Sequence, residues 1–263
     1  MTWHTQRMVA FDTETTGVDL DADRIVTAAV IHLGGGRPTE HAVGTGGQPL
    51  MLDPGIPIPD DATRVHGITT ERARAEGIPA AEGIRTIVAE LANAAASGLP
   101  IVAINAAYDL TLLDREARRH GITPLTERGL TVHVLDPMVI DKHVDRYRRG
   151  KRTLTALCEH YAAPLDDAHN AAADALGAAR VLYRLGQRAQ MTVDQLERLG
   201  YLDDAITRWH LLGAMTVPQL HEAQVGWAKE QAESLAAYFR RQGKHDRATS
   251  VRGDWPLIPV QEA

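Results

Sequence analysis

The 263-residue chain is long enough to bury a sizeable core, either as one large domain or as one domain with a helical appendage. Hydrophobic residues make up 44% and charged residues 24%, which excludes a disordered or fibrous protein. The formal net charge of −6 argues against a protein that coats nucleic acid through bulk electrostatics. It does not exclude a nucleic-acid enzyme, because bound cations can attract phosphate to an acidic site.

The single cysteine, Cys158, excludes an internal disulfide and a zinc site built from several cysteines. Its apolar surroundings predict a small core side chain in a protein of a reducing compartment. The N-terminal residues lack a basic-then-apolar signal pattern, and no apolar run approaches the roughly 18 residues that a membrane span needs. We therefore expect a cytoplasmic protein that does not act on membranes.

Apolar runs with strand character open the chain, at residues 8–11 and 25–33. A region rich in glycine and proline follows, and it predicts a third short strand and a long surface connection. Helical spacing begins near Pro79. The first part of the chain therefore contributes mainly strands.

Short strands then alternate with helices up to about residue 190. We predict strands at 101–104 and 131–135, and helices from near Asp109, over 153–161 and over 171–185. This order predicts an α/β domain over residues 1–190, with a mixed central sheet flanked by helices.

From Thr192 onward the sequence shows helical periodicity alone. One apolar stripe covers 196–212 and a second covers 217–238, as in a helical hairpin. Residues 245–263 are expected to form an extended tail. We predict that 191–263 is a C-terminal helical extension of the α/β domain.

Acidic residues with metal-ligand character lie at two predicted strand ends. Asp12 and Glu14 are two residues apart at the end of the first strand, so their side chains leave the same face about 6.6 Å apart. Asp109 follows the buried strand 101–104, at the start of a helix. Each feature alone has an ordinary explanation, a solvated strand end or an acid that favours the N-terminus of a helix.

A histidine and another aspartate follow near the predicted helix 171–185. On one continuous helix, His169 and Asp174 would be separated by about 140° and could not share a pocket. The segment before His169 reads as a loop, which would let the histidine swing over a metal centre as a general base. An exposed loop histidine is the competing interpretation.

Taken together, these motifs are far more specific than any one of them. The order D-x-E, N-x-x-[FY]-D and H-x-x-x-x-D, with the first motif written FDTETTG over residues 11–17, resembles the DEDDh exonucleases. This is the family of the bacterial polymerase III proofreading subunit, ribonuclease T and oligoribonuclease. The segment Val65-His-Gly-Ile-Thr, which we expect to form a loop, also resembles the family's HGI segment, and the resemblance covers about residues 7–187. Ile104 and Tyr108 depart from the family, which commonly has His and Phe there.

The resemblance implies an RNase H-like exonuclease fold and a metal-dependent 3′→5′ exonuclease. It implies that two Mg²⁺ or Mn²⁺ ions are held by four carboxylates and that a histidine is the general base, so that the catalytic residues are Asp12, Glu14, Asp109, His169 and Asp174. Water would attack the last phosphodiester and release a nucleoside 5′-monophosphate from the 3′ end.

Contacts with the substrate are predicted at three further places. The resemblance implies that the terminal nucleotide lies against Thr15, Thr16 and Gly17, against Val65 and His66, and near Asn105. A basic cluster, residues 146–152, lies before the helix that leads to His169, and Arg148, Arg149 and Lys151 are candidates for binding phosphates of the upstream strand. A solvated charged loop is the equal alternative.

Several functional interpretations stay open at this point. DNA is favoured over RNA as the substrate, with a role in proofreading or repair, but an RNA-trimming enzyme would carry the same five residues. The helical tail offers a docking surface for a DNA polymerase or another protein. A binding module without turnover, acting through its tail, is a different hypothesis, and so is a chance set of acids in an unrelated α/β protein.

The tail holds three of the four tryptophans, Trp209, Trp227 and Trp255. They either form a partner surface or pack the hairpin onto the main domain.

Overall fold

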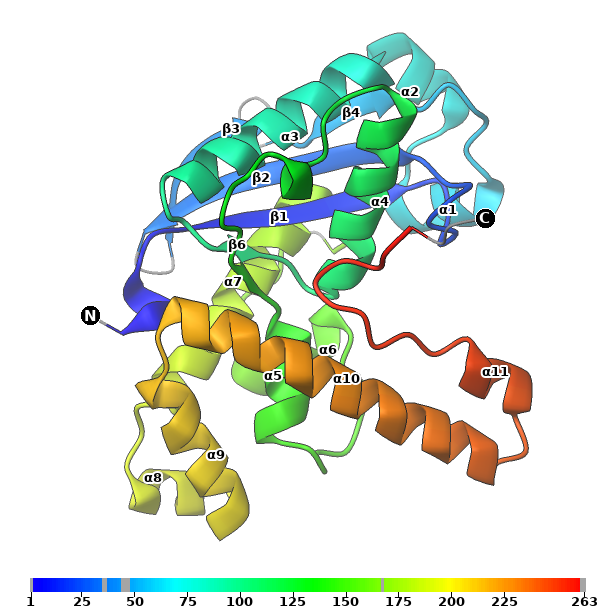
Figure 1. Cartoon of the computed structure of the whole chain (residues 1–263). Coiled ribbons are helices and arrows are strands. Elements are labelled where there is room, and N and C mark those ends of the chain that lie inside the picture. The colour runs from blue at the N-terminus through cyan, green and yellow to red at the C-terminus, as the bar shows by residue number, and fades with distance from the viewer. Residues whose placement is uncertain (1, 35–36, 44–47, 167, 261–263) are drawn as a thin grey trace.

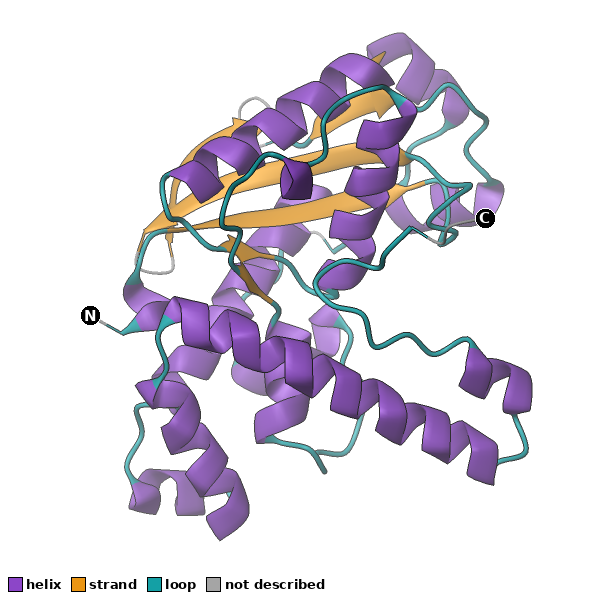
Figure 2. Cartoon of the chain, viewed as in Figure 1, coloured by secondary structure: helices purple, strands orange, loops and turns teal. Residues whose placement is uncertain are grey.

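The computed structural model describes residues 2–34, 37–43, 48–166 and 168–260, with the backbone alone for 37–43. Its strands are β1 (Met8–Thr15), β2 (Ile25–Gly34), β3 (Arg37–Val43), β4 (Leu50–Asp53), β5 (Ile78–Pro79), β6 (Ile101–Val102) and β7 (Val134–Leu135). Its α-helices are α1 (Asp60–His66), α2 (Thr70–Glu76), α3 (Ala80–Ala96), α4 (Ala106–Arg119), α5 (Pro137–Val144), α6 (Leu154–Tyr161), α7 (Ala171–Arg188), α8 (Val193–Arg198), α9 (Asp203–Ala214), α10 (Val217–Arg241) and α11 (His245–Thr249). Figure 2 shows that helices predominate outside one central sheet.

The sheet is mixed, as predicted. Its order is β5-β4-β2-β1-β6-β7, with β3 also paired to β2. The pairs β1–β2, β2–β3 and β2–β4 are antiparallel, and β1–β6, β6–β7 and β4–β5 are parallel. Helices α3 and α4 cover one face and α7 covers the other (Figure 1). Strands β1 and β2 are therefore buried along almost their whole length, because helices cover both of their faces.

The predicted elements differ from the observed ones mainly at their ends. The glycine-rich region contains two strands, β3 and β4, where one was predicted, and residues 35–36 and 44–47 of it lie outside the described residues. Strand β6 is shorter than predicted, and helix α4 begins at Ala106, three residues before Asp109. Val65 and His66 belong to the last turn of α1, so the prediction of a loop there was wrong.

The C-terminal helices share a hydrophobic core with the sheet. Trp209, Trp227 and Trp255 are 0, 9 and 7% exposed and belong to the same buried cluster as β1 and α7. Their role in packing is therefore confirmed, and a partner surface made from these three rings is not. The expected extended tail begins with the short helix α11. Among the described residues, no helix is long and apolar enough to cross a membrane.

Candidate active site

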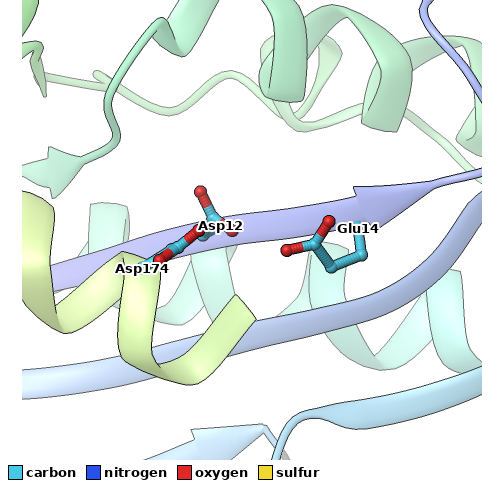
Figure 3. Close-up of side chains that lie close together, drawn as sticks. All are labelled: Asp12, Glu14 and Asp174. Atoms are coloured by element: carbon cyan, nitrogen blue, oxygen red, sulfur yellow. The ribbon is translucent and has the colours of Figure 1, made fainter. Parts of the chain in front are cut away.

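Strand β1 and helix α7 bring three carboxylates together. Asp12, Glu14 and Asp174 each offer an oxygen, and these atoms lie within 4.8 Å of one another (Figure 3). The alternation of side chains along β1 places Asp12 and Glu14 on the same face, as predicted, and α7 packs across that face. This group could therefore hold a metal ion.

Asp109 adjoins this group from the first turn of α4. Strand β6 ends opposite Ala10, and the carboxylate of Asp109 lies beside the next part of β1, where Oδ1 accepts the hydroxyl hydrogen of Thr13 at 2.5 Å. Burial raises the pKa of Asp109 to about 7, against the lowering effect of the Thr13 hydrogen bond. Asp109 does not belong to the 4.8 Å group among the described residues, yet its charge raises the pKa of Asp12.

Burial and mutual repulsion both disfavour the ionised carboxylates of this site. The pKa of Asp12 is raised well above its ordinary value by burial first, and then by the charges of Asp109, Asp174 and Glu14. Burial first, and then the charges of Asp174 and Asp109, raise the pKa of Glu14 to about 7. Carboxylate oxygens are the donors that Mg²⁺ and Mn²⁺ prefer, and a divalent cation would offset this repulsion. The donor set therefore fits the metal ions that the sequence predicted.

His169 precedes α7, as the sequence predicted. Asn170 caps the helix, accepting the backbone N–H groups of Ala172 and Ala173 at 3.0 and 3.4 Å. His169 has φ 70, in the sparsely populated left-handed region, and its backbone N–H donates to Asp174 Oδ2 at 3.2 Å. This conformation ties the exposed histidine to the end of the carboxylate group instead of continuing the helix.

A pocket of about 420 Å³ lies between the histidine and the sheet. Glu14, His66 and His169 line it together with parts of β4 and α2. His66 is half-buried, and its pKa is lowered by burial first and then by the nearby charge of His169, with the Thr15 backbone acting in the opposite direction. Two histidines therefore face the same pocket as Glu14, a member of the carboxylate group.

The predicted turn 15–17 closes on itself and on α4. The hydroxyl of Thr15 donates to the Gly17 carbonyl at 2.7 Å, and Tyr108 donates to the same carbonyl. Thr16 is buried and donates to Asp23 Oδ1 at 2.6 Å. A Cβ at Gly17 would collide with the Asp23 carboxylate, so a larger residue would displace a group that accepts hydrogen bonds from Thr16 and from the Asp19 backbone.

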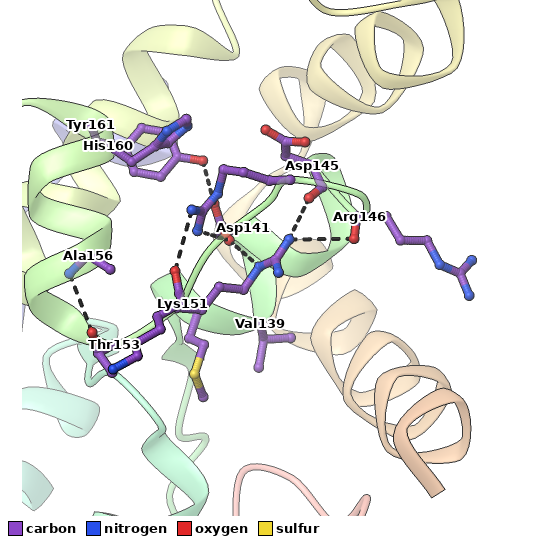
Figure 4. Close-up of polar contacts among 12 residues, drawn as sticks. Val139, Asp141, Asp145, Arg146, Lys151, Thr153, Ala156, His160 and Tyr161 are labelled. Carbon is purple, nitrogen blue, oxygen red and sulfur yellow. Dashed lines mark hydrogen bonds and ion pairs between the residues drawn. The ribbon is translucent and has the colours of Figure 1, made fainter. Parts of the chain in front are cut away.

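Two arginines of the basic cluster 146–152 pair with a buried aspartate, whereas Arg146 points away from it (Figure 4). Asp141 is fully buried and pairs with Arg148 at 3.0 Å and with Arg152 at 2.7 Å, while Tyr161 donates to it at 2.7 Å. Arg148, predicted to bind phosphate, therefore has a structural partner. Arg149 and Lys151 are exposed, and their contact with substrate stays a prediction.

A buried clamp, formed by Asp136 and Gln224, positions α4 and was not predicted from the sequence. Asp136 accepts the backbone N–H groups of Asn105 and Ala106 at 3.2 and 3.0 Å, and it also caps α5. Its own N–H donates at 2.7 Å to Gln224 of α10, which is fully buried. The Asp-Pro pair at 136–137 is a typical helix start and could have indicated the cap. Nothing in the sequence links it to Gln224, 88 residues away.

The chain that carries this site matches a known protein family. A family model described as "Exonuclease" (RNase_T) matches residues 9–182, a range that contains all five predicted catalytic residues. The chain belongs to the exonuclease family. The DEDDh resemblance of its motifs is thereby confirmed, and the hypothesis of chance acids in an unrelated α/β protein is wrong.

Relatives of this exonuclease domain occur in longer proteins. The chain is 25% identical to a PolC-type DNA polymerase III of Lacticaseibacillus paracasei over 198 residues, 73% of this chain and 12% of the relative. It is 31% identical to a DNA polymerase III subunit epsilon-like protein of Rhodobacter capsulatus over 180 residues, 67% of this chain and 23% of the relative. The chain therefore spans less than a quarter of either relative.

Solved structures support the fold. Exonuclease I of E. coli, in complex with a dT13 oligonucleotide, superposes with a TM-score of 0.57 at 18% identity, over 74% of this chain and 43% of that one. Exonuclease I of Methylocaldum szegediense gives 0.55 at 18% identity, over 75% and 46%. The predicted RNase H-like exonuclease fold, a mixed sheet flanked by helices, is thus confirmed.

Proposed function

We propose that this exonuclease is a metal-dependent 3′→5′ enzyme that removes nucleoside 5′-monophosphates from the 3′ end of DNA. The observation that carries the proposal is the convergence of Asp12, Glu14 and Asp174 within 4.8 Å, with Asp109 beside them. Four acids from β1, α4 and α7 meet at one place although they are distant in sequence. Their mutual repulsion is unfavourable without a cation.

Two Mg²⁺ or Mn²⁺ ions are the cofactors that we propose, with Asp12, Glu14, Asp109 and Asp174 as their ligands. Such ions would polarise the phosphodiester and stabilise the charge that develops on its oxygens. The chain itself fixes the ligands on rigid elements, since β1 lies in the middle of the sheet and both helices pack against it.

His169 is the general base in this proposal. Its place before α7, at the mouth of the pocket with Glu14, allows it to take a proton from the attacking water. His66 and the turn 15–17 would contact the terminal nucleotide. Val65 and Asn105 would do so from outside the lining of the 420 Å³ pocket. Tyr108 supports this arrangement by holding the Gly17 carbonyl.

DNA is the proposed substrate, in preference to RNA. The two sequence relatives are named as DNA polymerase III proteins, and an exonuclease I neighbour was solved with a DNA oligonucleotide. We propose a single-stranded or frayed 3′ end, encountered in proofreading or repair. Residues 1–190 would form the catalytic domain, and 191–263 would include a docking surface for a polymerase or another protein.

A ladder assay tests the polarity and the metal requirement. The chain is incubated with Mg²⁺ or Mn²⁺ and 5′-labelled single-stranded DNA, mismatched-end duplex and single-stranded RNA. We expect stepwise shortening from the 3′ end, fastest on DNA, and its loss with EDTA or in Asp12→Ala. Shortening that persists in Asp12→Ala would contradict the proposed ligand set. Absence of shortening on every substrate would instead favour a binding module.

A further inference from the structure

A second groove, of about 690 Å³, lies where residues beyond the family match pack against residues within it. Its walls are α5, α10 and the chain segment 251–255. Helix α10 and this segment come after residue 182, where the family match ends. Figure 1 shows α10 passing α5, and the C-terminal chain returning beside α10 after α11. The family match therefore covers the wall formed by α5 but not the walls formed by α10 and residues 251–255.

The groove opens at the helix that carries Asp109. Asn105 lines it at the N-terminus of α4, and Asp136, the clamp of that helix, lines it from the end of β7. Strands β1, β6 and β7 run parallel, and Asp109 and Asp136 follow β6 and β7, so the groove and the carboxylates lie at one edge of the sheet. A shallower groove of about 660 Å³ continues toward α6 and shares Asn105, Met138, Lys142 and Arg152 with it.

Positive charge gathers in this groove although the chain carries a net charge of −6. Lys142, Arg146 and Arg208 line it, and within the part of the chain that the structure describes none of them lies in an ion pair with a carboxylate. Lys142 is half-buried, and burial lowers its pKa. Other cations of the lining already have acidic partners, Arg152 with Asp141 and Arg252 with Asp254. These three cations are therefore available to an anionic ligand, although the acids Asp136 and Glu230 also line the groove.

Aromatic rings lie along the same groove. His143 and Trp227 stack in parallel at 3.8 Å, and burial with the charges of Arg208 and Arg146 lowers the pKa of His143 to about 4. The imidazole is therefore neutral at pH 7 and forms a flat ring pair with Trp227. Tyr238 follows on α10 and is 49% exposed. Cations beside an exposed aromatic ring, here Tyr238, can bind a single strand, because the cations contact its phosphates while an unstacked base lies against the ring.

We propose that this groove binds the single-stranded nucleic acid upstream of the terminal nucleotide, with its phosphates on Lys142, Arg146 and Arg208 and a base against Tyr238. The inference rests on the proposed exonuclease function, because it requires a strand whose 3′ end lies at the carboxylates. A strand held here extends the contact well beyond the terminal nucleotide. Long substrates therefore gain affinity that short ones lack.

Binding is measured first, in EDTA, so that no hydrolysis occurs. Fluorescence anisotropy of a labelled single strand of about 16 nucleotides is followed as a function of salt. The variant Lys142→Gln/Arg146→Gln/Arg208→Gln is compared with wild type and with Arg240→Gln/Arg241→Gln/Lys244→Gln. The control changes the net charge equally at exposed positions of α10 and the turn after it, none of which lines the groove.

Each phosphate contact on a single strand contributes about 0.7 to the slope of log K against log salt. Loss of three contacts should lower the slope by about 2 and the affinity at least about tenfold near 0.1 M salt, while the control keeps both. Tyr238→Ala should weaken binding without changing the slope. Equal slopes for the groove variant and the control would overturn the proposal.

Hydrolysis then separates this inference from the proposed function. In Mn²⁺ the groove variant should cleave a strand of about 4 nucleotides as wild type does, but show a raised KM on one of about 16. A wild-type chain that cleaves neither strand refutes the exonuclease, whereas the salt slopes in EDTA still decide whether the groove binds single strands. An unchanged KM on the long strand would refute the groove as a substrate site.

Discussion

Replacement of Glu14 by glutamine should stabilise the metal-free protein. Burial and the charges of Asp174 and Asp109 raise the pKa of Glu14 from 4.5 to about 7, so the ionised carboxylate is unfavourable in the folded state. The amide keeps the shape of the side chain and removes one negative charge from the cluster. The ionised carboxylate of a cation ligand is expected to destabilise the folded protein when the cation is absent.

The size of this stabilisation follows from the shift in the pKa of Glu14. Each pKa unit corresponds to about 1.4 kcal/mol, so a rise from 4.5 to about 7 costs about 3 kcal/mol at a pH above both values. The folded pKa of this acid is raised. The cost is therefore absent below about pH 4.5, grows between pH 4.5 and 7, and is complete above pH 7. For a chain of this size, about 3 kcal/mol corresponds to a melting temperature higher by roughly 6 to 12 °C.

The assay is thermal unfolding in EDTA between about pH 4.5 and 8, with wild type, Glu14→Gln and the control Glu233→Gln, which changes an exposed residue of α10. The difference between wild type and Glu14→Gln should open with rising pH, and the control should follow wild type. Addition of Mn²⁺ at pH 8 should stabilise wild type more than Glu14→Gln. If Glu14→Gln had the same melting temperature as wild type at every pH in EDTA, burial and repulsion would not disfavour the ionised Glu14.

Three other substitutions separate catalysis from packing. His169→Gln should lower the hydrolysis rate about 10²–10⁴-fold and leave the melting temperature unchanged, because the side chain is exposed; a normal rate would remove His169 as the base. Asp141→Asn should cost about 3–5 kcal/mol in urea unfolding, since Arg148 and Arg152 lose their buried partner, and full stability would contradict that role. Gln224→Leu should cost about 1–3 kcal/mol for each backbone group left unpaired at residues 134 and 136, again by urea unfolding; no loss would show that the clamp is dispensable.

The convergence of the candidate catalytic residues was predictable because its signals are local. Asp12 and Glu14 share a face through strand alternation alone, and His169 had to precede the helix because five residues of helix would turn it away from Asp174. The order of strands and helices likewise determined the mixed sheet. Short-range geometry and one recurring motif order were sufficient for these features.

Features that depend on distant neighbours were not predictable. Arg148 resembles its neighbours Arg149 and Lys151 in sequence, and only the burial of Asp141 shows that it forms a structural ion pair. Gln224 lies at an apolar position of the α10 stripe, where a polar residue has no local explanation. Its partner is the backbone of β7 and Asp136, which the tertiary fold alone brings to it.

Element ends were also underdetermined. Helix α4 begins at Ala106 because Asp136 accepts the N–H groups of Asn105 and Ala106, and this cap comes from another part of the chain. Val65 and His66 were assigned to a loop, yet Gly67 ends a helix there in the left-handed conformation. A terminal turn of this kind has little hydrophobic periodicity to reveal it.

A comparison of a linear single-stranded DNA with a covalently closed circle of the same sequence tests the central claim most directly. Both are incubated with the chain and Mn²⁺, and the released nucleotides are identified by mass spectrometry. The carboxylate geometry and the family predict that the linear strand is converted to nucleoside 5′-monophosphates while the circle stays intact. Cleavage of the circle, or release of products other than 5′-monophosphates, would contradict an exonuclease that hydrolyses the terminal phosphodiester.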